Sequence, residues 1–143
     1  MATFNLQEYG GSIKKAIELA LEYEQEYEEI IRMKDPEGKG YYEADLSSID
    51  INELLPSAKE MELINFLEAN DYELTKILCI IMWIGRDSSF QEKDGSYDYC
   101  KVREFYDRMG WEEDKSCKID YLCSKTRLYT YLQKGIKKLN ICL

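Results

Sequence analysis

The sequence contains no histidine among its 143 residues. Histidine is the usual general base near neutral pH, the usual partner of a serine or cysteine nucleophile, and a common ligand of zinc and iron. Neither a glycine-rich phosphate loop nor a nucleophile elbow is present to suggest other chemistry. We therefore predict a protein that is not an enzyme and has no catalytic residue, metal or cofactor. An unusual enzyme built from tyrosine, lysine and carboxylates is the alternative.

Long apolar runs are also lacking. The longest, Ile77–Ile84, is far shorter than the roughly 20 residues that a helix needs to cross a bilayer. The N-terminal residues show no basic segment followed by an apolar one, so we expect neither a signal peptide nor a membrane partner. The five cysteines are odd in number and form no Cys-x-x-Cys pair. This pattern is typical of reduced thiols and favours a cytoplasmic location.

Proline is scarce, with two residues in the chain, so helices can run uninterrupted. Apolar residues make up 45% of the sequence and charged residues 33%, which are the proportions of a folded globular chain. A chain of this length fits one domain and buries roughly 68% of its unfolded surface. We expect residues 1–143 to form a single helical domain. Its parts are an acidic helix (13–34), a linker (35–56) and a helical core (57–143).

Short sequence signals predict where the helices begin and end. Ser12 is the expected N-cap of the first helix, and the proline and glycines of residues 35–40 are expected to end it. Ser57 and Glu60 have the spacing of a capping box, and Asn70 or Asp71 is expected to cap the following helix. Further helices are predicted near residues 99–109, 118–123 and 126–141.

The stretch ILCIIMWI, residues 77–84, is apolar on every side and predicts a buried helix over residues 72–85. Gly85 is expected to end this helix in the left-handed conformation. Gly135 lies inside the last predicted helix, where glycine costs about 1 kcal/mol relative to alanine, so we expect close helix packing there. The predicted fold class is all-α: one compact domain of about five to six helices around a central apolar helix (72–85).

The chain contains the blocks KILCIIMWIGRD (residues 76–87) and IDYLCSKTRLYTYLQKGIKKLNI (residues 119–141). Together they resemble a bacterial family catalogued only as a domain of unknown function. Its members carry an apolar helix ending in Trp-Leu-Gly-Arg-Gly-Asp and a C-terminal Tyr-Leu-Leu-Gly-Thr-Pro-Leu-Leu pattern that leads into Asp-Tyr-Leu-x-x-Gly-Leu. The residues that match are Trp83, Gly85, Arg86, Tyr121, Leu122, Thr126, Leu128, Tyr131, Leu132 and Gly135. The chain departs from the pattern at Asp87, where the family has glycine, and at Lys125 and Arg127. The resemblance implies an all-helical fold, and it implies no activity. We expect a bacterial or phage protein.

Charge is distributed unevenly along the chain. The net charge is −9, and the acids are concentrated in the first half. No lysine or arginine occurs between Ala16 and Ile31, although cations four residues from each glutamate would relieve the repulsion. Steps of four, four and three residues place four glutamates on one acidic line: Glu18, Glu22, Glu26 and Glu29. This line is either a solvated helix face or a surface for a basic partner.

Tyrosine is abundant, with 12 residues, and several lie among the acids. Tyr23, Tyr41 and Tyr42 are candidates for the same contact surface, because tyrosine is common at interfaces. We therefore predict a protein-binding or regulatory module with a basic protein partner and no direct contact with nucleic acid. In the most specific version of this prediction, the module inhibits a basic nucleic-acid-binding protein by mimicking the charge of nucleic acid, as an inhibitor of the anti-defence type. A homo-oligomeric structural protein, such as a homodimer, is the alternative.

Arg86 follows the apolar run and has two interpretations. In the structural one it pairs with a carboxylate such as Asp120 or Glu104 and covers the core with its aliphatic stem. In the functional one its guanidinium holds an anion of a ligand or a carboxylate of a partner.

Overall fold

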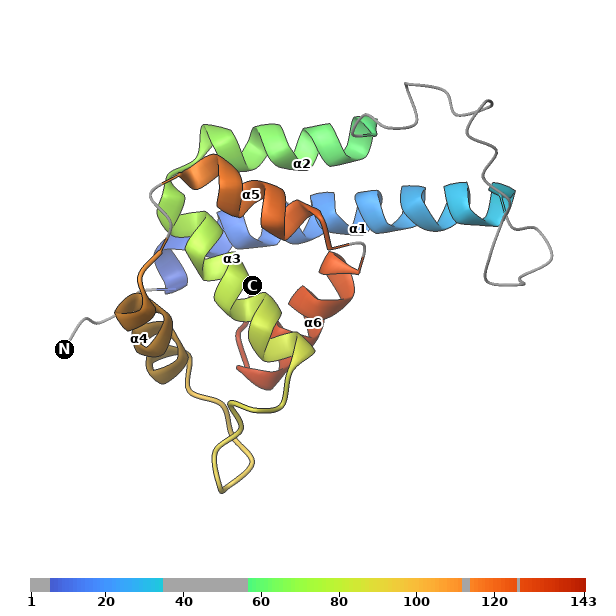
Figure 1. Ribbon diagram of the computed structural model, residues 1–143. Helices are drawn as coiled ribbons and strands as arrows, with labels where there is room; N and C mark the ends of the chain where they lie inside the picture. Colours follow the sequence, from blue (N-terminus) through green and yellow to red (C-terminus); the bar gives the residue numbers. More distant parts are fainter. Residues whose placement is uncertain (1–5, 35–56, 112–113, 126) are drawn as a thin grey trace.

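The computed structural model describes residues 6–34, 57–111, 114–125 and 127–143 (Figure 1). Within these ranges the chain forms α-helices and no strand, so the all-α prediction is confirmed. The elements are the short 3-10 helix η1 (Leu6–Tyr9), α1 (Gly10–Lys34), α2 (Ala58–Ala69), α3 (Tyr72–Arg86), α4 (Tyr99–Met109), α5 (Lys115–Cys123) and α6 (Leu128–Lys138). The predicted linker lies outside the described residues. None of the described helices has the length and hydropathy that crossing a bilayer requires.

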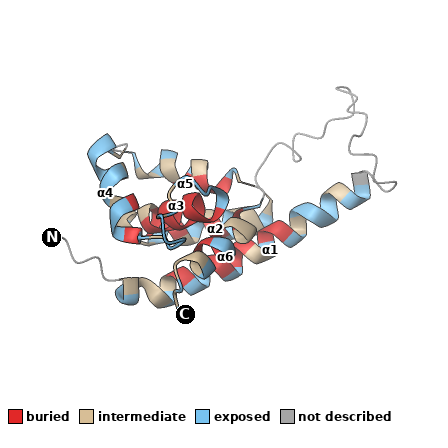
Figure 2. Cartoon of the chain, turned by 90° about the horizontal axis from the view of Figure 1, so that it is seen from below, coloured by how far each residue is buried: buried red, intermediate tan, exposed pale blue. Residues whose placement is uncertain are grey.

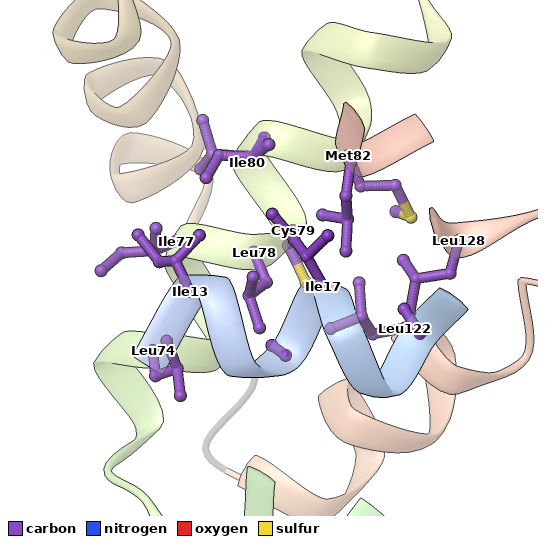
Figure 3. Packing of buried hydrophobic residues seen from close by; sticks show 14 of the residues in the cluster. Ile13, Ile17, Leu74, Ile77, Leu78, Cys79, Ile80, Met82, Leu122 and Leu128 are labelled. Carbon is purple, nitrogen blue, oxygen red and sulfur yellow. The ribbon is translucent and has the colours of Figure 1, made fainter. Parts of the chain in front are cut away.

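The central apolar helix is confirmed as α3. Every residue from Leu74 to Gly85 is buried except Lys76. Figure 3 shows that the side chains of α3 meet those of α1, α5 and α6 in one cluster, with Ile17 of α1 and Leu128 of α6 close to Cys79 and Met82. Burial of each such large apolar side chain contributes about 1.5–3 kcal/mol to folding. This cluster therefore accounts for why a mostly polar chain collapses around α3.

Two of the three predicted N-caps are confirmed. Ser57 Oγ accepts a hydrogen bond from Glu60 N at 3.2 Å, and Asp71 Oδ1 accepts one from Leu74 N at 3.2 Å. The third prediction was wrong, because α1 begins at Gly10 and Ser12 lies inside its first turn. The preceding η1 leads directly into α1, so the helix starts upstream of the serine.

Gly85 does not end α3 in the left-handed conformation. It is buried inside the helix, which continues to Arg86 and is capped by Asp87. A Cβ atom added to Gly85 would collide with the carbonyl oxygen of Tyr131 on α6, and it would lie 2.7 Å from the backbone nitrogen of Gly135. The two glycines thus mark the point where α3 and α6 cross backbone to backbone. The close packing predicted at Gly135 is confirmed.

α4 is attached to the helical body by a few specific contacts. Only Tyr99 and Val102 on this helix are buried. Arg103 Nη1 and Nη2 donate to the two carboxylate oxygens of Glu73 on α3 at 2.7 and 2.9 Å, and Arg103 Nε donates to Asp107 at 2.8 Å. Such a bidentate pair fixes both the position and the orientation of α4.

Candidate functional site

The C-terminal part of α1 projects away from the helical body (Figure 2). Buried side chains occur along α1 as far as Glu24, and from Gln25 to Met33 no side chain is buried. The cause lies in the length of α2, which meets α1 near Glu22, where Lys59 Nζ lies 3.4 Å from the Glu22 carboxylate. Figure 1 shows α1 continuing beyond the first turn of α2. Its last turns therefore form an accessible helical surface.

This projecting segment carries both apolar and acidic side chains. Four of them, Glu26, Glu29, Ile30 and Met33, are spaced at i, i+3, i+4 and i+7 and therefore share one helix face; we call them the distal α1 surface. Ile30 is 38% exposed and Met33 is 76% exposed. Tyr27, at the edge of this face, is 39% exposed. Large apolar side chains with adjacent carboxylates are thus presented to solvent on a helix that the core anchors at one end.

The acidic line predicted on the first helix is only partly exposed to solvent. Glu18, Glu22 and Glu29 are exposed, whereas Glu26 is half-buried. Lys59 pairs with Glu22 and also lies 3.7 Å from Glu62 of its own helix, so it neutralises part of the line. The spacing of residues along α1 cannot reveal this pairing, because Lys59 lies on another helix.

Tyr23 does not lie on the exposed surface. It is 8% exposed, and burial together with the nearby Glu60 carboxylate raises the pKa of its hydroxyl to about 12. The other two candidate tyrosines, Tyr41 and Tyr42, lie outside the described residues. Of the aromatic residues on α1, Tyr27 is therefore the one available to a partner.

Glu24 interrupts the apolar stripe of α1 and points into the molecule. The residue is 8% exposed, and its carboxylate accepts hydrogen bonds from Thr130 Oγ1 on α6 at 2.9 Å (Oε1) and 3.2 Å (Oε2). This contact ties the middle of α1 to α6. It also fixes where the anchored part of α1 ends and the projecting part begins.

Arg86 is exposed at the end of α3. Among the described residues, neither Asp120 nor Glu104 forms an ion pair with it, and Glu104 lies 3.8 Å from Arg108 instead. The pKa of the adjacent Asp87 is lowered mainly by the backbone N–H of Ser89, with a smaller contribution from Arg86. The structure does not place Arg86 with the distal α1 surface, so its role as an anion contact stays a prediction.

An aromatic cluster surrounds Trp83, which is 8% exposed. Its ring stacks on Tyr106 at a centroid distance of 4.1 Å, and Trp83 Nε1 donates to the Tyr121 hydroxyl at 2.9 Å. Trp111 lies 6.0 Å away, and the Lys118 ammonium lies 5.3–5.9 Å from three of these rings. The sequence favoured Trp83 as a core residue, and its burial is consistent with that. The partners come from α4, from α5 and, for Trp111, from the segment that follows α4, and sequence spacing cannot pair these.

Metal binding and thiol chemistry both depend on how cysteines and carboxylates are grouped. No group of three or more cysteine, aspartate or glutamate side chains in them is arranged to hold a metal ion. The five cysteines, all among the described residues, form no disulfide with one another. Burial raises the pKa of the Cys79 and Cys123 thiols to about 12, which keeps these two protonated and unreactive at neutral pH.

Comparison with known proteins adds no relative: no protein-family model, curated protein or solved structure matches the chain. The resemblance to the bacterial domain family therefore stays a prediction.

Proposed function

We propose that this protein is a non-enzymatic binding module that contacts a basic protein through the distal α1 surface. The observation that carries the proposal is the projection of α1 beyond α2, which leaves Ile30 and Met33 exposed beside Glu26 and Glu29. Exposed apolar side chains on a projecting helix are the usual means by which one protein presents a helix to a groove on another.

The two kinds of side chain have different tasks in such a contact. Ile30, Met33 and Tyr27 supply apolar area, which provides most of the binding free energy. Glu26 and Glu29 select a partner whose groove is bordered by lysine or arginine, and they accelerate encounter with it. The expected partner surface is therefore an apolar groove with a basic border, and we place the interaction in the cytoplasm.

A narrower form of the proposal is inhibition by charge mimicry. The exposed carboxylates of Glu18, Glu22 and Glu29 follow one line along α1. In this form they would occupy the positions at which a nucleic-acid-binding protein holds phosphates. The pairing of Glu22 with Lys59 weakens this form relative to the general one. If mimicry operates, nucleic acid competes with the protein for the partner.

The test is affinity capture from the native lysate with three forms of the tagged protein. These are the wild type, Glu26→Lys/Glu29→Lys on the distal α1 surface, and the matched control Glu68→Lys/Glu104→Lys. The control changes the net charge equally at two exposed acids on other helices. We expect a basic protein to be held by the wild type and the control and lost with the distal variant.

Two results would contradict the proposal. One is capture of the same proteins by all three forms, and the other is capture of none. Release of the captured protein by added nucleic acid would support the mimicry form, whereas retention would restrict the proposal to its general form.

A further inference from the structure

We propose that the distal α1 surface of one copy of the chain docks into a groove along α6 of a second copy. The inference rests on the proposed function to the extent that both use the distal α1 surface. The groove has a volume of about 520 Å³. Its lining comprises Tyr129, Thr130, Gln133, Lys134, Ile136 and Lys137.

The groove has the chemistry that the distal α1 surface requires. Tyr129 and Ile136 are half-buried and supply apolar area, while Lys134 and Lys137 are exposed. No described carboxylate forms an ion pair with either lysine. From Ser124 to Leu143 the sequence contains no aspartate or glutamate, so the positive charge of this side is not compensated locally.

The spacing of charges agrees on the two helices. Lys134 and Lys137 are three residues apart on α6, and Glu26 and Glu29 are three residues apart on α1. A rise of about 1.5 Å per residue separates each pair by about 4.5 Å along its helix axis. Two helices lying side by side can therefore form both ion pairs at once, with Ile30 entering the groove.

The distal α1 surface that docks into the α6 groove must belong to a second copy of the chain. Within one molecule, the buried part of α1 is tied to α6 through Glu24 and Thr130. The distal α1 surface follows on the same continuous helix, and a straight helix cannot turn back onto α6. If the contact is reciprocal, two copies form a closed two-fold dimer with two such contacts.

Charge exchange between the two surfaces tests this docking by sedimentation velocity at high micromolar concentration. The forms are the wild type, Lys134→Glu/Lys137→Glu, Glu26→Lys/Glu29→Lys, and the quadruple variant that combines all four changes. The quadruple variant keeps the wild-type net charge of −9, so general repulsion between copies is unchanged. Lys14→Glu/Lys15→Glu is the control, because these lysines are exposed on α1 and its charge change equals that of the lysine variant.

We expect the wild type and the control to dimerise. Lys134→Glu/Lys137→Glu and Glu26→Lys/Glu29→Lys should each associate at least about tenfold more weakly, because attraction between the two surfaces becomes repulsion. The quadruple variant should dimerise again, which general damage to the fold cannot produce. A monomeric wild type, or a quadruple variant that stays monomeric, would overturn the docking. Because Lys134 and Lys137 have no part in the proposed function, lysate capture by Lys134→Glu/Lys137→Glu reports on that function separately.

Discussion

The absence of a Cβ atom at two glycines determines how closely α3 and α6 approach each other. At Gly85 the hydrogen in place of a side chain leaves room for the backbone of α6, and Gly135 provides the same room for Ile81 of α3. Glycine weakens a helix by about 1 kcal/mol relative to alanine, so both positions lose helix propensity and gain contact between the two backbones.

The first prediction concerns Gly85→Ala. A Cβ atom there meets backbone atoms of Tyr131 and Gly135, which cannot rotate away, so α3 and α6 must separate. We expect the free energy of unfolding, measured by urea denaturation, to fall by about 1–3 kcal/mol or more.

The matched control is Gly11→Ala, where nothing lies within 4 Å of an added Cβ. Because Gly11 lies in the first turn of α1, alanine should leave stability unchanged or raise it by up to about 1 kcal/mol. Equal stability of Gly85→Ala and the wild type would show that the two backbones are not in contact.

A second prediction at this scale concerns the buried carboxylate of Glu24. Thr130→Val removes the hydroxyl that donates to it, and we expect a loss of about 1–3 kcal/mol in unfolding free energy. Thr130→Ser retains the hydroxyl and serves as the control. If valine and serine at this position gave equal stability, the hydrogen bond would not contribute to holding α1.

At the scale of the elements, α4 depends on the charged network around Arg103. Asp107 accepts hydrogen bonds from Arg103 Nε at 2.8 Å and from Trp111 Nε1 at 2.7 Å. Burial by itself raises the pKa of Asp107, but the two hydrogen bonds together with the charges of Arg103 and Lys76 lower the pKa overall. α4 is thus held most firmly when Asp107 is ionised.

The third prediction follows from this lowered pKa. A carboxylate with a lowered pKa in the folded state adds stability above its unfolded pKa of about 3.9 and loses it as the pH falls through the folded value. We expect stability to decrease as the pH falls below about 4 and Asp107→Asn to reduce that dependence. Urea denaturation across this pH range measures it, and an unchanged slope in the variant would contradict the role of Asp107.

The sequence predicts the helices better than it predicts their contacts. Local signals such as Ser57, Asp71 and the apolar run of α3 depend on neighbours in sequence, and the structure agrees with them. The position of Gly85 depends instead on α6, which lies about 45 residues further along the chain. Tyr23 was misplaced on the surface for a related reason, since the packing that buries it is not visible in the spacing of α1.

At the scale of the whole molecule, α1 combines an anchored half with a projecting half. Its apolar stripe extends beyond the part that the core covers, and Met33 lies beside the end of this stripe. Tyr27, Ile30 and Met33 therefore contribute little to folding in the isolated chain. The acidic residues beside them give this end a negative charge, which is the basis for proposing a basic partner.

A fourth prediction follows from this division. Tyr27→Ser/Ile30→Ser should change the free energy of unfolding by about 1 kcal/mol or less, because a single surface substitution rarely changes it by more than about 0.5 kcal/mol. The same variant should lose the captured partner in the lysate experiment. A large loss of stability would instead assign these side chains to the core.

The most direct test of the account is to ask which end of the molecule another protein touches. A photoreactive amino acid at position 33, on the distal α1 surface, is compared with one at position 109, at the end of α4. The two methionines are similarly exposed, at 76% and 69%. After irradiation in the native lysate, the account predicts crosslinks to another chain from position 33 and not from position 109. Crosslinks from position 109 alone, or none from position 33, would contradict it.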